Sequence, residues 1–180
     1  MRNSMHKLLL VIFFALVCLS KTYTQVESIR WYSIQQAEAL MKKEKRKIFI
    51  DVFTNWCTAC KSMEQATFMQ QNIAKYLNDN YYPVKLNAEE RNDINFRRKT
   101  YHFVMQSGVG FNELAAEFLK GQLSYPTVVF LDEDLNLIQA IQGFKAADQF
   151  EKIMTYFGDN NHKKVPWTKY EKIYQPIKNK

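Results

Sequence analysis

The sequence is poor in the residues that build metal sites and disulfide frameworks. Its 180 residues include only three cysteines and three histidines. Beyond the first 24 residues the cysteines are Cys57 and Cys60, and the histidines are His102 and His162. A zinc site that starts from one Cys-x-x-Cys pair needs further ligands, which these two histidines would have to supply. The sequence therefore disfavours a zinc site, and we expect no metal.

The sequence also lacks an apolar run as long as a membrane-spanning helix needs, which is about 20 residues. The unbroken apolar run Leu8–Leu19 has 12 residues and follows a positively charged start. This pattern is typical of a secretory leader. We therefore expect residues 1–24 to be a signal peptide that is cleaved after Thr24, with cleavage after Ser20 as the alternative.

Two other fates of this segment remain open. Cys18 invites acylation, as in a lipoprotein, although lipid attachment favours a small residue before the cysteine and Val17 stands there. An uncleaved leader would act as an anchor. We expect an extracytoplasmic protein, periplasmic or secreted, that associates with a membrane only if its leader is retained or acylated. Disulfides persist outside the cytoplasm, so export bears on the meaning of the cysteine pair.

The net charge is small once the leader is removed. The whole chain carries a formal charge of +7, and loss of Arg2, Lys7 and Lys21 leaves 22 basic against 18 acidic residues, hence +4. This excess argues only weakly for an anionic partner, and we expect no nucleic-acid partner. A hydrophobic fraction of 47%, with 13 Phe and 10 Tyr, is typical of one globular domain.

The apolar pattern predicts alternating helices and strands. Ser33 and Gln36 are spaced as a capping box that opens a helix. The predicted helices are Ser33–Lys45, Thr58–Tyr76 with a break near Gln70–Asn72, Asn112–Leu119 and Ala146–Phe157; the predicted strands are Lys47–Thr54, Tyr82–Asn87, Thr127–Leu131 and Leu137–Gln142. Residues 89–111 give no clear pattern. A mixed sheet between two helical layers would bury these strands, so we expect an α/β fold.

The cysteine pair is the most informative feature of the chain. A bond between Cys57 and Cys60 closes almost no loop, so it removes little entropy from the unfolded chain and is a poor structural staple. A lone Cys-x-x-Cys after an apolar strand is typical of reversible thiol–disulfide chemistry. A structurally inert pair is the alternative.

Residues outside the pair complete a known pattern. From Ile29 to Phe157 the chain resembles the thioredoxin superfamily. The resemblance rests on positions that occur in the right order: Asp51, Trp56-Cys57-x-x-Cys60-Lys61, Lys85, Tyr125-Pro126-Thr127 and Gly143. It implies a thioredoxin fold, in which a mixed central sheet is flanked by helices, with an insertion before the strand that follows Pro126. The domain would span residues 29–157, and residues 158–180 would form a basic extension.

The resemblance also implies a role for each cysteine. Cys57 would start a helix, whose free N–H groups lower the pKa of the thiol, and would attack a partner's disulfide. Cys60, one turn further on, would resolve the mixed disulfide. Asp51 would be a buried acid that takes the proton of Cys60, and Lys85 on the next strand would modulate it. The alternatives are an Asp51 that faces water and a Lys85 that is merely an exposed lysine.

Three aromatic or cyclic residues are implied in substrate binding. Pro126 would follow a cis peptide bond after Tyr125, so that the backbone faces Cys57 and offers an edge to an extended substrate. Trp56 would shield the sulfurs and add contact surface, and simple core packing is its alternative. No cofactor is implied beyond the redox-active Cys57–Cys60 disulfide.

The run from Asn55 to Lys61, with the following Glu64 and Thr67-Phe68, is similar to the C-terminal domain of transmembrane thiol-disulfide reductases. It is also similar to small exported thioredoxin-like proteins. The dipeptide between the cysteines, Thr58-Ala59, lacks the histidine that stabilises the reduced thiolate in strong oxidases, so we expect a comparatively reducing pair. Residues 91–111 are longer than thioredoxin's connection, and the basic extension has no counterpart in the family.

We therefore expect an oxidoreductase that reduces the disulfides of exported partner proteins. Its electrons would come from a membrane-bound or extracytoplasmic thiol-disulfide donor. A disulfide isomerase or oxidase is the alternative among enzymes. A non-catalytic binding module, with residues 91–111 and the basic extension as contact surfaces, is the alternative outside them.

Overall fold

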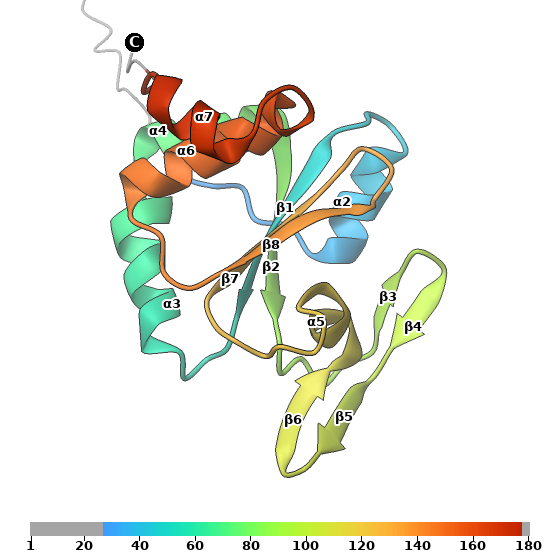
Figure 1. Ribbon diagram of the computed structural model, residues 1–180. Helices are drawn as coiled ribbons and strands as arrows, with labels where there is room; N and C mark the ends of the chain where they lie inside the picture. Colours follow the sequence, from blue (N-terminus) through green and yellow to red (C-terminus); the bar gives the residue numbers. More distant parts are fainter. Residues whose placement is uncertain (1–26, 178–180) are drawn as a thin grey trace, which may run out of the picture.

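The computed structural model describes residues 27–177 and shows a four-stranded sheet between two helical layers (Figure 1). The strands are β1 (Lys47–Phe53), β2 (Tyr81–Asn87), β7 (Thr127–Leu131) and β8 (Leu137–Gln142). Their order is β2-β1-β7-β8, with β1 parallel to β2 and antiparallel to β7, and β7 antiparallel to β8. The mixed sheet predicted from the sequence is confirmed.

The two central strands are apolar on both faces. Helices cover both sides of the sheet, so β1 and β7 read as nearly continuous apolar runs rather than as alternating patterns. One face packs on α2 (Ile34–Met41) and α5 (Glu113–Phe118). The other face packs on the segment from α3 (Thr58–Met63) to α4 (Gln71–Asn80) and on α6 (Ala147–Gly158).

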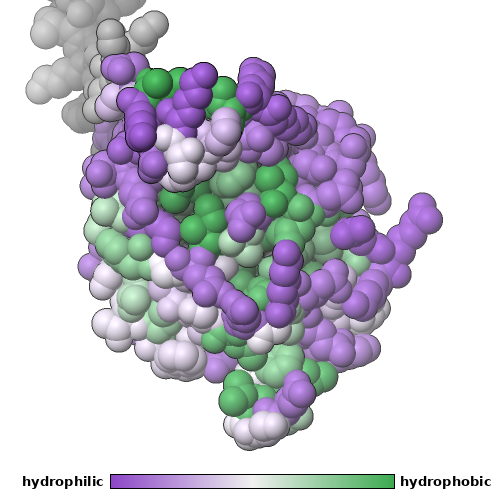
Figure 2. All heavy atoms as spheres, in the orientation of Figure 1, coloured by the Kyte–Doolittle hydropathy of each residue, from purple (hydrophilic) through white to green (hydrophobic). Residues whose placement is uncertain are grey.

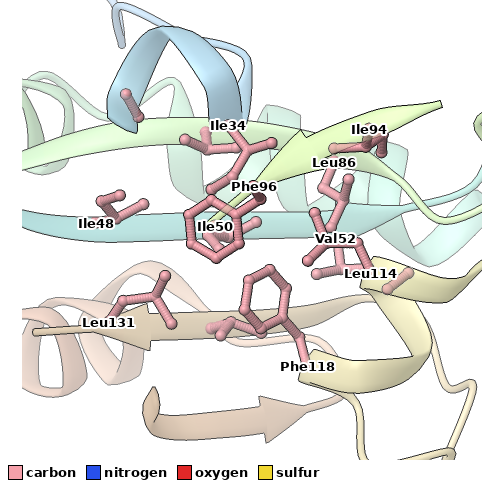
Figure 3. Close-up of a cluster of buried hydrophobic side chains, with 14 of the residues drawn as sticks. Ile34, Ile48, Ile50, Val52, Leu86, Ile94, Phe96, Leu114, Phe118 and Leu131 are labelled. Carbon is pink, nitrogen blue, oxygen red and sulfur yellow. The ribbon is translucent and has the colours of Figure 1, made fainter. Parts of the chain in front are cut away.

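Alternate side chains of β1 belong to two separate cores. Ile48, Ile50 and Val52 face the α2 and α5 side, where Phe118 closes the cluster (Figure 3). Phe49 faces the other side, where its ring lies 5.4 Å from that of Phe150. Each fully buried side chain of this size stabilises the fold by ~1.5–3 kcal/mol. The two cores together hold β1, and with it the start of the loop that carries the cysteines.

The start of α2 follows a local signal, whereas its end does not. α2 begins after the predicted capping box, in which Ser33 Oγ accepts from the Gln36 amide at 3.2 Å and Gln36 Oε1 accepts from the Ser33 amide at 2.8 Å. The helix ends at Met41, so its predicted extension to Lys45 is wrong. The chain turns after Met41 to reach β1, and Lys45 instead donates to the carbonyl of Glu133 at 2.9 Å.

The predicted helix from Thr58 to Tyr76 is interrupted. α3 passes into a π-helical segment, Glu64–Phe68, and α4 begins after Gln70, whose backbone is extended. The predicted break near Gln70–Asn72 is therefore confirmed, although α4 continues to Asn80.

Residues 89–111 contain two hairpins that the sequence analysis did not predict. They are formed by β3 (Ile94–Phe96) with β4 (Lys99–Tyr101), and by β5 (Phe103–Gln106) with β6 (Val109–Asn112). Phe96 packs on Phe118, with 5.9 Å between ring centroids, and so joins the first hairpin to the core. The β5–β6 hairpin projects from the body of the domain (Figure 1).

The basic extension is packed against α6 over the part that the structure describes. It contains α7 (Trp167–Ile173), from which the buried Tyr170 donates to Thr155 Oγ1 at 2.9 Å. Glu151 of α6 accepts from the Tyr174 hydroxyl at 2.6 Å and from the amide of Ile177 at 2.7 Å. The expected leader, with Cys18, lies outside the described residues. Within residues 27–177 no helix has the length and apolar character needed to cross a membrane.

Candidate redox site

The cysteine pair opens α3 directly after the loop that follows β1. Cys57 and Cys60 are joined as a disulfide, and Cys57 is the N-cap residue of the helix. The Cys57 sulfur accepts from the backbone N–H of Cys60 at 3.0 Å. The same N–H groups would face a Cys57 thiolate after reduction. A helix N-terminus stabilises an anion and therefore favours the thiolate at Cys57.

Exposure does not distinguish the two cysteines. Cys57 is 5% exposed and Cys60 is 7% exposed, so both are buried in the disulfide form. Their difference lies in position, because Cys57 caps the helix and Cys60 lies in its first turn. The assignment of Cys57 as the attacking thiol therefore depends on the N–H groups around it.

Asp51 lies in the centre of the sheet, paired in register with Lys85 of β2 and Val128 of β7. It is only 2% exposed, so the alternative in which it faces water is wrong. Its position alternates with Ile50 and Val52, which places its side chain on the α3 side of the sheet. Burial raises the pKa of Asp51 to about 6, against the opposing effect of the Lys85 ammonium group.

Lys85 is enclosed by the site. Its Nζ lies 3.3 Å from Asp51 Oδ2 and forms a second ion pair with Glu64. The ammonium group also lies 4.9 Å from the ring centroid of Trp31 and 5.2 Å from that of Phe53. The alternative of a merely exposed lysine is therefore wrong.

Glu64 is a residue of this site that had no role among the residues expected from the sequence. Glu64 follows Cys60 by four positions, which places the two side chains on the same helix face. Its charge adds to the rise in the pKa of Asp51. The spacing from Cys60 to Glu64 was the available signal, but only the fold shows that Lys85 joins Glu64 to Asp51.

Asp51 and Cys60 line one cleft of about 320 Å³, together with Lys85, Glu64 and Thr54. Thr54 is buried, and its hydroxyl has no hydrogen-bond partner among the described residues. The Asp51 carboxyl group, with its raised pKa, thus lines the same cleft as the buried Cys60. This arrangement suits a base that removes the proton of the Cys60 thiol.

The loop before β7 carries the predicted cis peptide bond between Tyr125 and Pro126. Thr127, next in the chain, pairs with Val52 near the end of β1, so this loop lies beside the strand that leads to Cys57. The amide of Gly143 donates to the Pro126 carbonyl at 2.8 Å. The hydrogen bond from Gly143 ties the loop to the end of β8.

Trp56 is 65% exposed, so packing of its side chain in the core is excluded. Its Nε1 donates to Glu89 Oε1 at 2.8 Å, and its ring meets that of Tyr125 edge-on, at 6.0 Å between centroids. The indole is therefore held at the surface beside the cis-proline loop.

His102 and His162 are not among the residues that line the cleft of Cys60. His102 pairs with Asp93 at 2.8 Å, which raises the pKa of His102. His162 packs on Tyr156 and Phe157. In the part of the chain that the structure describes, no three His, Cys, Asp or Glu side chains are grouped as a metal ion would need.

Comparisons with known proteins agree with this geometry. Residues 19–156 match the model of a family described as Thioredox_DsbH, protein of unknown function, DUF255. An uncharacterized protein of Archaeoglobus fulgidus is 30% identical over 87 residues, which are 48% of this chain and 68% of that protein. The thiol:disulfide interchange protein DsbD of Actinobacillus pleuropneumoniae is 29% identical over 115 residues, 63% of this chain and 16% of DsbD. Mouse spermatogenesis-associated protein 20 is 32% identical over 93 residues, 52% of this chain and 12% of that protein.

Solved structures show the same fold. A thioredoxin from Thermus thermophilus superposes with a TM-score of 0.55 at 18% identity, over 72% of this chain and 87% of that one. A DsbH oxidoreductase gives a TM-score of 0.53 at 18% identity, over 76% and 90% of the two chains. The expected thioredoxin fold is thus confirmed, as is a distant similarity to the thiol:disulfide interchange protein DsbD. This chain has a Cys57–Cys60 disulfide and belongs to the thioredoxin-like Thioredox_DsbH family.

Proposed function

We propose that the protein is an extracytoplasmic thiol–disulfide oxidoreductase that reduces disulfides in partner proteins. The observation that carries this proposal is the cleft that Asp51 and Cys60 both line, next to a Cys57 that caps α3. A structural staple would need neither a base nor a helix N-terminus.

The reaction transfers two electrons from the protein dithiol to the partner. The Cys57 thiolate attacks one sulfur of the partner disulfide, and the other partner sulfur leaves as a thiolate. Asp51 removes the proton of the Cys60 thiol, and the resulting thiolate attacks the Cys57 sulfur. The bond between Cys57 and the partner breaks, the partner leaves as a dithiol, and Cys57–Cys60 becomes a disulfide.

The direction of transfer follows from how well the Cys57 thiolate is stabilised. Thr58 and Ala59, between the cysteines, supply no charged side chain to that thiolate. A less stabilised thiolate makes the dithiol form a stronger reductant. The proteins reduced would be disulfide-containing exported proteins.

The supply of electrons and the location belong to the same proposal. A membrane-bound or extracytoplasmic thiol-disulfide protein would return the disulfide to the dithiol, and the similarity to DsbD, named as a thiol:disulfide interchange protein, supports a place in such a relay. The apolar run in residues 1–24 supports export. Amino-terminal sequencing of the protein from the extracytoplasmic fraction should give Gln25 as the first residue. A chain that keeps Met1 in the cytoplasm would refute export.

The reduction potential of the cysteine pair is the decisive measurement. Equilibration with dithiothreitol buffers should give a value nearer that of thioredoxin, about −270 mV, than that of a strong oxidant, about −120 mV. A value at the oxidising end would replace the reductase with an oxidase. Insulin reduction provides the second assay, with Cys57→Ser as the inactive control. No turnover by the reduced wild type would favour a non-catalytic binding module.

A further inference from the structure

A second cleft, of about 520 Å³, lies beside the redox site and is not used in the reaction described above. The β5–β6 hairpin forms one side of it, through Phe103 and Met105, and the loop after β2 forms the other, through Glu89, Glu90 and Arg91. Asn55 lines both this cleft and the one that contains Cys60. The two clefts therefore share a residue of the loop that carries the cysteines. We call the second one the hairpin cleft.

The hairpin wall of this cleft is apolar and shaped by a glycine. Met105 is 65% exposed, and Figure 2 shows hydrophobic atoms on the projecting hairpin. A Cβ at Gly110 would lie 2.5 Å from Phe103 Cζ and 2.8 Å from Met105 Sδ. The ends of both side chains thus lie across β6 on the cleft side, in space that a larger residue at Gly110 would take from them. Methionine adapts its shape to different apolar groups, which suits a surface that receives varied partners.

The opposite wall is tied to the redox site. Glu89 accepts from Nε1 of Trp56, the exposed residue that precedes Cys57. The amide of Asn112, at the end of β6, donates to the Ala88 carbonyl at 2.7 Å. This bond connects the hairpin to the loop that holds Glu89. The apolar hairpin and Trp56 are thus both hydrogen-bonded to the loop after β2, which holds Ala88 and Glu89.

The charges in the hairpin cleft favour a cationic occupant. Glu89 and Glu90 both line it, and none of the ion pairs in residues 27–177 includes either of them. The nearest basic residue in the sequence, Arg91, is also unpaired within that range and places its guanidinium 4.9 Å from the centre of the Phe103 ring. The two carboxylates thus lack a cation at ion-pair distance.

We propose that the hairpin cleft binds the polypeptide segment that flanks the target cysteine of the partner protein. An apolar side chain of that segment packs on Phe103 and Met105, and a lysine or arginine beside it meets Glu89 and Glu90. The proposal rests on the reduction of partner disulfides proposed above and specifies the class of segment that is preferred. An extended segment suits an open cleft with one apolar wall and polar groups opposite.

The test uses the reduced full chain and two synthetic peptides, each linked through its single cysteine to glutathione. One peptide carries Leu-Lys next to the cysteine, and the other carries Ser-Glu. Single-turnover rates are divided by the rate for hydroxyethyl disulfide, which has no flanking segment. The Leu-Lys peptide should react about tenfold faster than the Ser-Glu peptide, a size expected for one apolar contact and one exposed ion pair.

Three variants locate the preference. Met105→Ser should reduce it about threefold and Glu90→Gln about twofold. Ile173→Ser, which changes a comparably exposed apolar residue on α7, should leave the preference as in the wild type. Melting curves show whether each variant folds. If the preference is absent in the wild type, or is retained in both cleft variants, the proposal that the hairpin cleft binds the flanking segment is refuted. Turnover of hydroxyethyl disulfide would still support the proposed function.

A binding measurement distinguishes failure of the hairpin-cleft proposal from failure of the proposed function. Fluorescein-labelled peptides with serine in place of cysteine are titrated with the protein, and anisotropy reports binding without redox chemistry. Tighter binding of the Leu-Lys peptide, weakened by Met105→Ser and Glu90→Gln, supports the hairpin cleft even if no disulfide is reduced and the proposed function fails. Equal affinities for the two peptides refute the hairpin cleft.

Discussion

Replacement of Asp51 by asparagine should make the oxidised protein more stable, by an amount that depends on pH. Burial raises the pKa of Asp51 from the ordinary 3.8 to about 6, so the folded protein holds this proton more tightly than the unfolded chain does. The stability linked to the group is therefore fully present below pH 3.8 and is lost as the pH rises to 6 and beyond. At 1.36 kcal/mol per pH unit, the loss is ~3 kcal/mol at neutral pH.

Asparagine nearly matches the protonated acid in shape and does not ionise. The Asp51→Asn protein should therefore equal the wild type near pH 4 and exceed it by ~3 kcal/mol at pH 8, which corresponds to ~6–12 °C in melting temperature for a chain of this size. Urea unfolding at fixed ionic strength between these pH values measures the difference. Asp148→Asn, at an exposed position on α6, is the matched control and should show no comparable trend. A difference that stays flat from pH 4 to pH 8 would refute the reasoning.

The same substitution tests the proposed chemistry. Without a base, the Cys60 thiol loses its proton more slowly, so resolution of the mixed disulfide should slow by at least ~10-fold at pH 7. Attack by Cys57 should change less, because the N–H groups of α3 remain. Stopped-flow measurements with a mixed disulfide follow the two steps separately. Equal resolution rates in the two proteins across pH would mean that Asp51 transfers no proton.

Further substitutions give distinct outcomes. Cys57→Ser should abolish insulin reduction, whereas Cys60→Ser should accumulate mixed disulfides with partners on a non-reducing gel; greater reactivity of Cys60 toward iodoacetamide would reverse the assignment. Glu64→Gln removes a charge that raises the pKa of Asp51, so the pH-dependent loss of stability should move to lower pH in the urea series, and an unchanged midpoint would contradict the coupling. Thr54→Val removes a buried hydroxyl that has no partner among the described residues and should stabilise the protein by ~1 kcal/mol, whereas a loss of stability would show that the hydroxyl is satisfied.

Sequence patterns were sufficient wherever the chain obeys a short-range rule. The capping box at Ser33 and the apolar runs of the central strands identified their elements, and the order of motifs around Cys57 identified the fold. The β3–β4 hairpin was missed because its turn is atypical: Arg97 and Arg98 both adopt positive φ, at 52° and 62°, where glycine or asparagine would give a recognisable signal. The turn of the β5–β6 hairpin does contain such a signal, Gly108 with φ 82°, but its strands are only four residues long and weakly patterned. Glu64 was missed because its partner, Lys85, is 21 residues away and reaches it only in the folded sheet.

The stability that Asp51 costs and the reactivity that it would provide have one physical origin. An exposed aspartate, with an ordinary pKa of 3.8, is too weak a base to take a proton from a thiol efficiently at neutral pH. The sheet raises this pKa by withholding water from the charged form, and the same loss of hydration destabilises the fold. The Lys85 ammonium group limits the rise in the pKa of Asp51, and the Glu64 carboxylate adds to that rise. A substitution near Asp51 that lowers its pKa should therefore stabilise the protein and slow proton transfer together. A substitution that changes only side-chain volume should not link stability to the rate of proton transfer.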